Sequence, residues 1–444
     1  MIIPQEYKWI FGEKSDNPLY KAFKNKSCID PRFLLFETEI KDFNTQNIIN
    51  SSFDESKFNA IYIHIPFCKT RCTYCRFFTE FNNENILNSY VESLVKEIIN
   101  QPVIKIRKKI INAVYLGGGT PTVLEEKHIT AIFDAIKKTH ILSNDCEITF
   151  ESNISLLNEN KISALKNAGI NRFSFGIQSF NTKVRKFVGR LSEKELLINM
   201  IKDIRKRNFA NISIDLIYGL PFQDIEILKE DINIGAGLGI EGFDIYQLDS
   251  SLLEKKFGDK LEFLTVSKRI EMFEMANQSL FELGYKNINN THYSNTSRER
   301  NLYTELTRAG SEIMRTDTIG YGAGAQGRIG VFKYSINPDV NLYVNAIKGS
   351  KSPIVKYLKI NEEKKILYDL IGQMDFGIIN CGWFKTLYNE DLFIKFGYLF
   401  DKWEENGLIV YSENNTIRLT LAGRFWKTNC IHGLIIWDNI LNNK

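Results

Sequence analysis

The stretch Ala60-Ile-Tyr-Ile-His-Ile-Pro-Phe-Cys68-Lys-Thr-Arg-Cys72-Thr-Tyr-Cys75 joins an apolar, β-branched segment to a loop that contains three cysteines. The alternating isoleucines at the start predict a β-strand. The loop places its thiols at CxxxCxxC spacing, and three thiolates can hold three irons of a [4Fe-4S] cubane while the fourth iron has no protein ligand. An open iron position is what a reactive cluster requires. The sequence therefore predicts a reactive [4Fe-4S] cluster on Cys68, Cys72 and Cys75.

Two other uses of these cysteines compete with a cluster. A structural zinc site would need four closed ligands, usually with a CxxC pair, and three unconnected buried thiols would need no metal. The nearby His64 shares its strand face with Tyr62, and its position beside Pro66 suits packing beneath the loop. We therefore interpret His64 as structural and the thiols as cluster ligands.

From Ala60 onward, short β-branched or aromatic runs alternate with longer amphipathic stretches. This alternation predicts six βα units with parallel strands, in a full or partial barrel or in an open doubly wound sheet. The predicted strands are Ala60–Ile65, Ala113–Leu116, Glu147–Ser152, Arg172–Gly176, Ile212–Ile217 and Phe243–Leu248. The predicted helices are Asn85–Asn100, Glu125–Lys138, Asn158–Ala168, Glu193–Arg207, Ile225–Leu238 and Val266–Leu283.

After about Pro338 the sequence is dominated by helical patterns. The predicted elements are helices over Ile360–Ile371, Asp391–Asn406 and Ala422–Leu441, and a hairpin that joins Leu408–Tyr411 to Thr416–Leu419 across Asn414–Asn415. This order suggests a small winged-helix-like domain. We interpret it as a cap on the barrel, because its last helix is apolar and aromatic rather than basic. The expected division is an N-terminal extension over 1–55, a barrel over 56–340 and the cap over 341–444.

Composition narrows the class of partner. The chain has 444 residues, 43% of them hydrophobic, which suffices for a large α/β domain and a smaller companion. A net charge of +4 is too small to predict a nucleic acid partner. No signal pattern opens the chain and no apolar stretch reaches about 18 residues, so we expect no membrane insertion. Three of the seven cysteines crowd together and the others are scattered, which predicts the reducing cytoplasm rather than a disulfide framework.

Glycine and polar residues follow four of the predicted strands. Gly117-Gly-Gly-Thr-Pro-Thr122 comes directly after the second strand, where small residues let the backbone approach a ligand. Glu151, Gln178 and Asp215 lie at the ends of the next three strands. Each feature alone could be a turn, a helix cap or a surface residue. Because barrel enzymes bind ligands at the carboxyl ends of their strands, we expect these residues to share one site.

The cysteine spacing, with aromatic Tyr74 directly before the third cysteine, resembles the signature of the radical S-adenosylmethionine (SAM) superfamily. The resemblance implies a partial (β/α)6 barrel and a cluster whose open iron is chelated by the amino and carboxylate groups of SAM. The segments HIPFC, GGGTPT, FGIQSF, DLIYGLP and Leu419–Trp426 are similar to the coproporphyrinogen dehydrogenase-like group. By this resemblance the SAM contacts are Tyr62, Tyr74, Gly118, Gly119, Thr120, Glu151, Gln178, Arg190 and Asp215.

This group acts on tetrapyrroles, and the resemblance implies three candidate functions. The dehydrogenase has a further cysteine two places beyond its third cluster ligand, whereas Arg76-Phe77-Phe78 follows Cys75 here, which disfavours porphyrinogen oxidation. The tracts 70–78, 297–303 and 322–327 look more like the haem-degrading methyltransferases, called anaerobilin synthases, than like the haem chaperones. The implied reaction transfers a methyl group from SAM to a haem meso carbon, opens the ring and frees iron without dioxygen. Arg76 departs from the glycine that we expect in this branch and would alter access beside the cluster.

Four residues are candidates for contact with haem. We predict His292 as a catalytic residue that reaches the haem iron or donates a proton near the ring. Arg298, Arg300 and Arg328 could pair with the haem propionates through bidentate hydrogen bonds, although a solvated charged face is the alternative for at least one of them. The resemblance also implies a flavodoxin- or ferredoxin-type electron donor.

Overall fold

A computed structural model describes residues 4–27, 37–40, 58–76, 80–100, 109–308 and 316–442. Its main element is a sheet of 13 strands. In spatial order these are β1 (Glu37–Glu39), β15 (Ile354–Ile360), β14 (Phe332–Ile336), β13 (Gln326–Ile329), β12 (Thr316–Tyr321), β2 (Phe58–Ile65), β5 (Ile110–Gly118), β6 (Ile141–Ser152), β7 (Arg172–Gln178), β8 (Asn211–Tyr218), β9 (Gly242–Gln247), β11 (His292–Ser294) and β10 (Lys286–Asn287).

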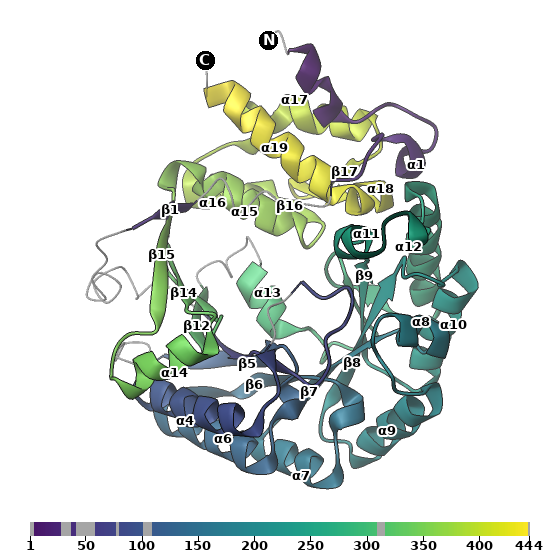
Figure 1. Ribbon diagram of the computed structural model, residues 1–444. Helices are drawn as coiled ribbons and strands as arrows, with labels where there is room; N and C mark the ends of the chain where they lie inside the picture. Colours follow the sequence, from purple (N-terminus) through teal and green to yellow (C-terminus); the bar gives the residue numbers. More distant parts are fainter. Residues whose placement is uncertain are drawn as a thin grey trace.

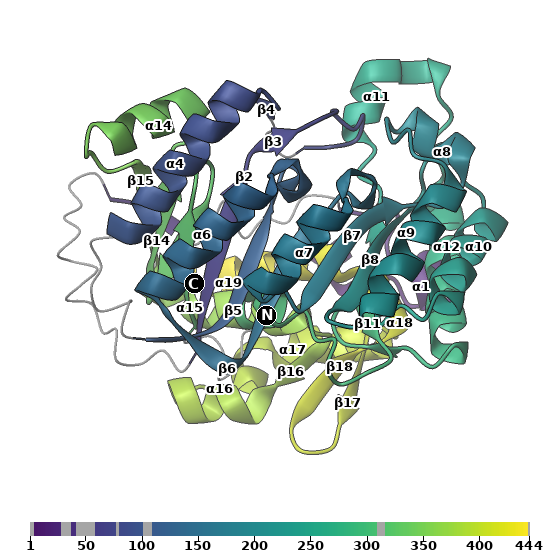
Figure 2. The same cartoon turned by 90° about the horizontal axis from the view of Figure 1, so that it is seen from below.

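The strands from β12 to β9 run parallel, and from β2 onward they follow one another in chain order. Figures 1 and 2 show the helices that connect them on the outer side of the curved sheet. These are α4 (Glu84–Asn100), α6 (Glu126–Thr139), α7 (Glu159–Ala168), α9 (Lys194–Arg207), α10 (Ile225–Gly237) and, after β9, α12 (Val266–Glu282). The six predicted strands and six predicted helices are therefore confirmed, with shifts at their ends; the largest is at β6, which begins at Ile141.

The edges of the described sheet make it a partial barrel. It becomes antiparallel through β13, β14, β15 and β1 on one side and through β11 and β10 on the other. The outermost described strands are β1 and β10, so the sheet is open. Because the crossover helices cover one face, the alternative of a doubly wound sheet does not hold.

Side-chain alternation in β2 determines what faces the inside of the barrel. Ile61, Ile63 and Ile65 are fully buried in the hydrophobic core, whereas Tyr62 and His64 are half-buried on the other face. The chain then continues into the short strand β3 (Phe67–Cys68), which pairs with β4 (Glu80–Phe81). The first cysteine of the predicted cluster loop is thus held in a strand.

The C-terminal elements form a small three-stranded sheet surrounded by helices, at the top of Figure 1. In chain order they are α15 (Lys365–Met374), β16 (Ile378–Asn380), α16 (Cys381–Tyr388), α17 (Leu392–Glu405), β17 (Ile409–Ser412), β18 (Thr416–Leu419), α18 (Leu421–Phe425) and α19 (Lys427–Asn442). The order up to β18 is that of a winged helix, as predicted. The hairpin at Asn414–Asn415 is confirmed, with both asparagines at positive φ.

Two predicted C-terminal helices have wrong boundaries. Ile360 ends strand β15, so α15 begins only at Lys365. The stretch predicted as one helix over Ala422–Leu441 is two, α18 and α19, which are separated at Trp426. Burial of the Trp426 side chain, whose ring nitrogen donates to the Leu19 carbonyl oxygen at 2.9 Å, accompanies this break.

The division of the chain into domains stays a prediction. The boundary between 55 and 56 lies outside the described residues. Beyond the boundary at 340, α14 (Val340–Lys348) and β15 still adjoin the large sheet. From the N-terminal extension, β1 pairs with β15, and η1 (Gln5–Phe11) and α1 (Pro18–Lys21) pack on the C-terminal helices.

Candidate functional site

A cavity of about 730 Å³ lies at the carboxyl ends of the parallel strands. Its wall comes from the cysteine loop, from the glycine-rich turn after β5 and from the ends of β6, β7, β8 and β9. Every residue predicted to bind the cluster or SAM lines it: Tyr62, Cys68, Cys72, Tyr74, Cys75, Gly118, Gly119, Thr120, Glu151, Gln178, Arg190 and Asp215. The fold thus gathers side chains that are more than 150 positions apart, from Tyr62 to Asp215, into one cavity.

The cysteine loop is fixed at both of its ends. The Cys68 thiol lies 3.2 Å from the Thr120 hydroxyl, which belongs to the glycine-rich turn. Further along the loop, the backbone N–H of Thr73 donates to the Val188 carbonyl oxygen at 3.2 Å, directly after α8 (Thr182–Phe187). These contacts hold the thiols on the cavity wall.

The glycine-rich turn needs its glycines because it packs directly on the cysteine loop. A Cβ atom on Gly119 would lie 2.7 Å from the Phe67 carbonyl oxygen and 3.1 Å from the Cys68 sulfur. Gly118 has φ +117°, and a Cβ there would lie 2.8 Å from the His64 ring. The turn therefore brings bare backbone against the cysteine loop and His64, and its contact with a bound ligand stays a prediction.

Aromatic rings form one side of the cavity. Tyr62 stacks on Tyr303 with ring centroids 5.8 Å apart, and Tyr115 lies 5.0 Å from the same ring. The Tyr62 hydroxyl lies 2.9 Å from Nδ1 of His64. Burial lowers the pKa of His64 to about 4, so this histidine is neutral near pH 7 and supports the tyrosine, in agreement with the structural role predicted for it.

Two acidic residues on the wall resist ionisation. Burial, and then the neighbouring Asp215, raise the pKa of Glu151 to about 8. Burial, and then Asp244, raise the pKa of Asp215 to about 7. The Gly118 N–H donates to Glu151 at 3.3 Å and the Ser174 hydroxyl donates to Asp215 at 3.2 Å. A cationic ligand would stabilise the ionised form of both acids.

Gln178 ends β7 beside Asp215 of β8, and Arg190 follows α8 and reaches the same part of the wall. The Arg190 guanidinium donates to the Gly176 carbonyl oxygen and is hydrogen-bonded to the Tyr74 hydroxyl. Gln178 has φ +70°, at a register irregularity between β7 and β8. A non-glycine residue in this conformation is uncommon and marks a strained position at the site.

The chemistry of this wall fits a [4Fe-4S] cluster and SAM. Among the described residues no three His, Cys, Asp or Glu side chains converge closely enough to hold a single metal ion. A cubane needs no such convergence, because each thiolate binds a different iron. Cys68, Cys72 and Cys75 would hold the cluster, and the bare turn with the two acids would hold a ligand that has a positively charged group.

Asp244 is a wall residue that the sequence analysis missed. It lies in β9 directly opposite Asp215 of β8, and Ser213 donates to its carboxylate at 3.3 Å. The two strands read Ser-Ile-Asp215-Leu-Ile-Tyr and Gly-Phe-Asp244-Ile-Tyr-Gln, so aligning them on their aspartates would have revealed it. Tyr115 and Tyr303 were missed as well. Tyr115 lies between the buried Val114 and Leu116 in β5, whereas Tyr303 lies in the helix α13 (Leu302–Arg308), where strand alternation gives no signal.

Arg76 links the cysteine loop to the loop after β9. Its guanidinium forms an ion pair with Asp249 at 2.7 Å and donates to the Ser251 hydroxyl. Arg76 and Asp249 both line the cavity. The arginine that departs from the expected glycine thus lies at the site, as its position after Cys75 implied.

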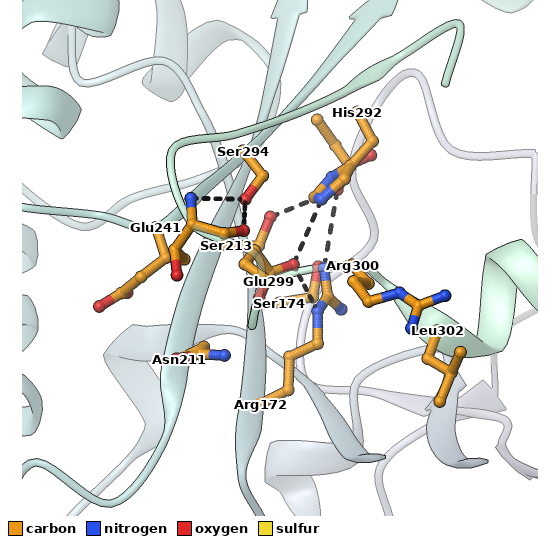
Figure 3. Close-up of polar contacts among 12 residues, drawn as sticks. Arg172, Ser174, Asn211, Ser213, Glu241, His292, Ser294, Glu299, Arg300 and Leu302 are labelled. Carbon is orange, nitrogen blue, oxygen red and sulfur yellow. Dashed lines mark hydrogen bonds and ion pairs between the residues drawn. The ribbon is translucent and has the colours of Figure 1, made fainter. Parts of the chain in front are cut away.

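His292 is not on the cavity wall. It is fully buried behind Asp244, with Nδ1 3.1 Å from the Asp244 carboxylate and Nε2 3.3 Å from that of Glu299. Figure 3 shows Arg172 pointing into the same group of buried charged side chains, where its Nε lies 2.7 Å from the Glu299 carboxylate. Burial lowers the pKa of His292, but the two carboxylates outweigh this effect and raise it to about 9. The catalytic role predicted for His292 stays a prediction, and its contacts are those of a residue that acts through Asp244.

The three predicted haem-pairing arginines are also away from this wall. Arg298 is exposed, and Arg300 forms an ion pair with Glu305 at 2.6 Å. Arg328 lines a separate cavity. These three arginines lie beyond β9 in the chain. The strands after β9 do not continue the sheet in chain order, so the order of residues in the sequence no longer predicts which of them lie together.

Comparison with known proteins identifies the family to which this chain belongs. The model of the Radical SAM superfamily matches residues 62–233. Anaerobilin synthase from Escherichia coli O157:H7 is 30% identical over 403 residues, which cover 89% of this chain and 88% of that protein. Heme chaperone HemW from Bacillus subtilis (strain 168) is 28% identical and the match covers 82% of this chain and 96% of that protein.

A solved structure shares the fold. Coproporphyrinogen III oxidase (HemN) from Escherichia coli superposes with a TM-score of 0.77 at 20% identity, covering 89% of this chain and 94% of that one. The chain therefore belongs to the radical SAM superfamily, in the group that contains anaerobilin synthase, heme chaperone HemW and oxygen-independent coproporphyrinogen III oxidase. Membership implies a [4Fe-4S] cluster and SAM. In the described part of the chain, no helix has the length and apolarity needed to cross a membrane.

Proposed function

We propose that this protein is a haem-degrading radical SAM methyltransferase, which methylates haem, opens the porphyrin ring to a linear tetrapyrrole and releases iron. The observation that supports this most directly is the 30% identity to anaerobilin synthase along 89% of the chain. The residues after Cys75 agree with it, since Phe77 stands where the dehydrogenase has its further cysteine. In this proposal the reaction runs anaerobically in the cytoplasm.

The wall residues have defined tasks in this proposal. The cluster and SAM, when bound, supply one-electron cleavage of a sulfur–carbon bond and the methyl group. Gly118 and Gly119 offer backbone to SAM without side-chain obstruction, and Glu151 and Asp215 balance its positive charge. The tyrosine stack of Tyr62, Tyr115 and Tyr303 gives a flat apolar surface on which a macrocycle can lie.

Electrons must reach the cluster from outside the chain. We assign this to a flavodoxin- or ferredoxin-type protein. Lys69, Thr70 and Arg71 of the cysteine loop are exposed and precede the half-buried Cys72, so the cluster would lie close to the surface. A cluster that lies a short distance from the protein surface can receive electrons from a separate protein.

A haem chaperone is the second candidate. Its support is the similarity to heme chaperone HemW, which extends over 96% of that protein. A chaperone would keep the ring intact and would release haem to a partner. Oxidation of coproporphyrinogen III is the third, supported by shared fold and by 24% identity to the oxidase from Synechocystis sp..

One experiment separates the three functions. Protein with a reconstituted cluster is incubated without oxygen with haem, SAM and reduced flavodoxin, and the haem absorption band, free iron and product mass are followed. We expect loss of the band, release of iron and a product that contains an added methyl group. Stable bound haem would instead indicate a chaperone. In a parallel incubation with coproporphyrinogen III in place of haem, loss of carbon dioxide would indicate the oxidase.

Cys72→Ala provides the inactive comparison, because it removes one cluster ligand. Cys146→Ala is the matched control, since this thiol is buried in β6 and away from the cavity. We expect haem loss to stop in the first variant and to continue in the second. Equal haem loss in both variants would mean that the ring is destroyed by a process that does not need the cluster, and the proposal would be wrong.

A further inference from the structure

A second cavity, of about 440 Å³, adjoins the first. Tyr303 lines both, so one aromatic ring forms part of each wall. The second cavity is formed by β12 to β15 together with α13 (Leu302–Arg308) and α15. It therefore extends from the tyrosine stack of the first cavity toward the antiparallel edge of the barrel.

Strand register places three cations on one face of this cavity. Arg328 of β13 lies opposite Thr318 of β12 on one side and opposite Lys333 of β14 on the other. Two positions along β14, Ser335 lies opposite Lys356 of β15. Residues that lie opposite in neighbouring strands, or two apart in one strand, share a face. The sheet itself thus gathers Arg328, Lys333 and Lys356 in the cavity.

The wall combines these cations with aromatic rings. Nζ of Lys333 lies 5.0 Å from the ring centroid of Tyr368, a cation–π contact that holds the ammonium group over α15. At the other end, Tyr303 stacks on Tyr62. A ligand that spans the two cavities would meet a flat aromatic surface first and positive charge beyond it.

Asp369 of α15 is an acidic group near one of these cations, Arg328. It interacts with Arg328, accepts a hydrogen bond from the Tyr388 hydroxyl and is not part of the cavity wall. Burial raises its pKa to about 7, so part of its negative charge is lost near neutral pH. Among the described residues that line this cavity, the charged side chains are Arg328, Lys333 and Lys356, and none is acidic.

We propose that the second cavity is a subsite for the carboxylate-bearing edge of a flat aromatic substrate, with Arg328 and Lys333 as the carboxylate partners and Tyr303 beneath the ring. A tetrapyrrole with two propionates on one edge has this chemistry, so the inference rests on the proposed function and deepens it. The arginine binds one carboxylate through its planar fork and the lysine binds the other as a point charge.

The test compares haem with haem dimethyl ester, in which both carboxylates are blocked and the ring is unchanged. Binding is titrated anaerobically by the haem absorption band, in cluster-loaded native protein, in the double variant Arg328→Gln/Lys333→Gln and in Lys359→Gln. Lys359 is the matched control, since it lies on β15 but is exposed and outside the cavity. We expect the native protein and Lys359→Gln to bind haem more tightly than the ester, on the order of tenfold.

The double variant should bind both ligands alike, at the affinity that the native protein has for the ester. Its iron–sulfur absorption reports whether it is folded, and Lys333→Gln alone repeats the comparison, with a smaller loss, if the double variant does not fold. A native protein without preference for haem over the ester would overturn the subsite, and so would a preference that stays undiminished in the double variant or, where that does not fold, in Lys333→Gln.

These outcomes are independent of the ring-opening assay. A protein that prefers haem through Arg328 and Lys333 but leaves the ring intact would keep the subsite and refute the proposed degradation. A protein that opens haem and its dimethyl ester with equal affinity and rate would keep the degradation and refute the subsite.

Discussion

The carboxyl groups of Glu151 and Asp215 hold their protons more tightly than carboxyl groups in water. Burial is the larger cause in both, and a second acid adds to it, Asp215 for Glu151 and Asp244 for Asp215. A positively charged ligand would reverse this balance, because an opposite charge favours the ionised acid. Cation binding and proton release are therefore coupled at this wall.

Glu151→Gln tests this coupling. The pKa of Glu151 in the folded protein, about 8, is above its ordinary value of 4.5, so its stabilising effect is complete below about pH 4.5 and is lost as the pH rises through about 8. Glutamine has no such loss. We expect the variant without cluster or SAM to be more stable than the native protein at about pH 8, by roughly 1 kcal/mol since the group faces a cavity, and about equally stable near pH 4.5.

Urea unfolding across this pH range measures the difference, and calorimetry measures SAM binding to the cluster-loaded protein. SAM affinity should fall by about tenfold or more in Glu151→Gln, because a charged partner is removed. Glu195→Gln, at an exposed position of α9, should change neither quantity. Undiminished SAM binding in Glu151→Gln would remove this residue from the site.

At the scale of elements, the strands β7, β9 and β11 are joined by buried charge, although only β9 and β11 of these three pair directly. Arg172 begins β7, Asp244 lies in β9 and His292 begins β11, and Glu299 comes from the segment before α13 (Figure 3). All four side chains are nearly or fully inaccessible to solvent. Removing one member of such a cluster leaves an uncompensated charge, which destabilises the fold more than the cluster itself stabilises it.

His292→Gln tests whether this histidine supports the fold or contacts haem. The pKa of about 9 is above the ordinary 6.5, so its contribution to stability is complete below about pH 6.5 and is lost as the pH rises through about 9. We expect the variant to be less stable by roughly 3 kcal/mol near pH 6 and to lose most of this pH dependence. Haem affinity should stay within about twofold of the native value.

Chemical unfolding at several pH values and haem titration give these two readouts. A loss of haem affinity as large as that of the double variant Arg328→Gln/Lys333→Gln would place His292 at the substrate. Unchanged stability at all pH values would show that His292 is not held in its charged form by the buried carboxylates of Asp244 and Glu299.

At the scale of the whole molecule, the N-terminal segment over 4–27 contacts both the C-terminal helices and the barrel. The ring nitrogen of Trp403 in α17 donates to the Ile10 carbonyl oxygen at 2.8 Å. Tyr20 reaches Glu274 of α12 at 3.2 Å, and the Ser27 N–H donates to Asn429 of α19 at 3.0 Å. Figure 1 shows this N-terminal segment beside α17 and α19 at the top of the molecule.

Ile10→Ala measures the strength of this attachment. Ile10 is fully buried against the C-terminal helices, and truncation of such a side chain costs about 2–5 kcal/mol. We expect a lower unfolding midpoint and faster hydrogen exchange in α17 and α19, with the iron–sulfur absorption retained. Ile394→Ala is the matched control, because Ile394 on α17 is 88% exposed. Equal effects of the two substitutions would show that the N-terminal segment does not stabilise the C-terminal helices.

Much of the barrel and of its wall could be predicted because both depend on local sequence. Each βα unit has its own buried strand and amphipathic helix, and Cys68, Glu151 and Asp215 each lie in the carboxyl-terminal half of a strand or at its end. Since β2 to β9 occupy the sheet in chain order, residues at successive strand ends become neighbours. Asp244 lies directly opposite Asp215 and obeys the same rule, but it was missed because no motif of the family resemblance includes it.

The sequence by itself determined the cysteine loop and the parallel strands, since local periodicity and spacing are enough to specify them, and the resemblance of its motifs to a family implied which residues would bind SAM. Only the tertiary structure decided where the later segments lie: β11 returns antiparallel to β9 and encloses His292, whereas β12 crosses to pair with β2 and brings Arg328 to the far edge. No local pattern encodes these pairings. They depend on contacts between segments that are far apart in the chain, a property of the whole sheet rather than of any segment.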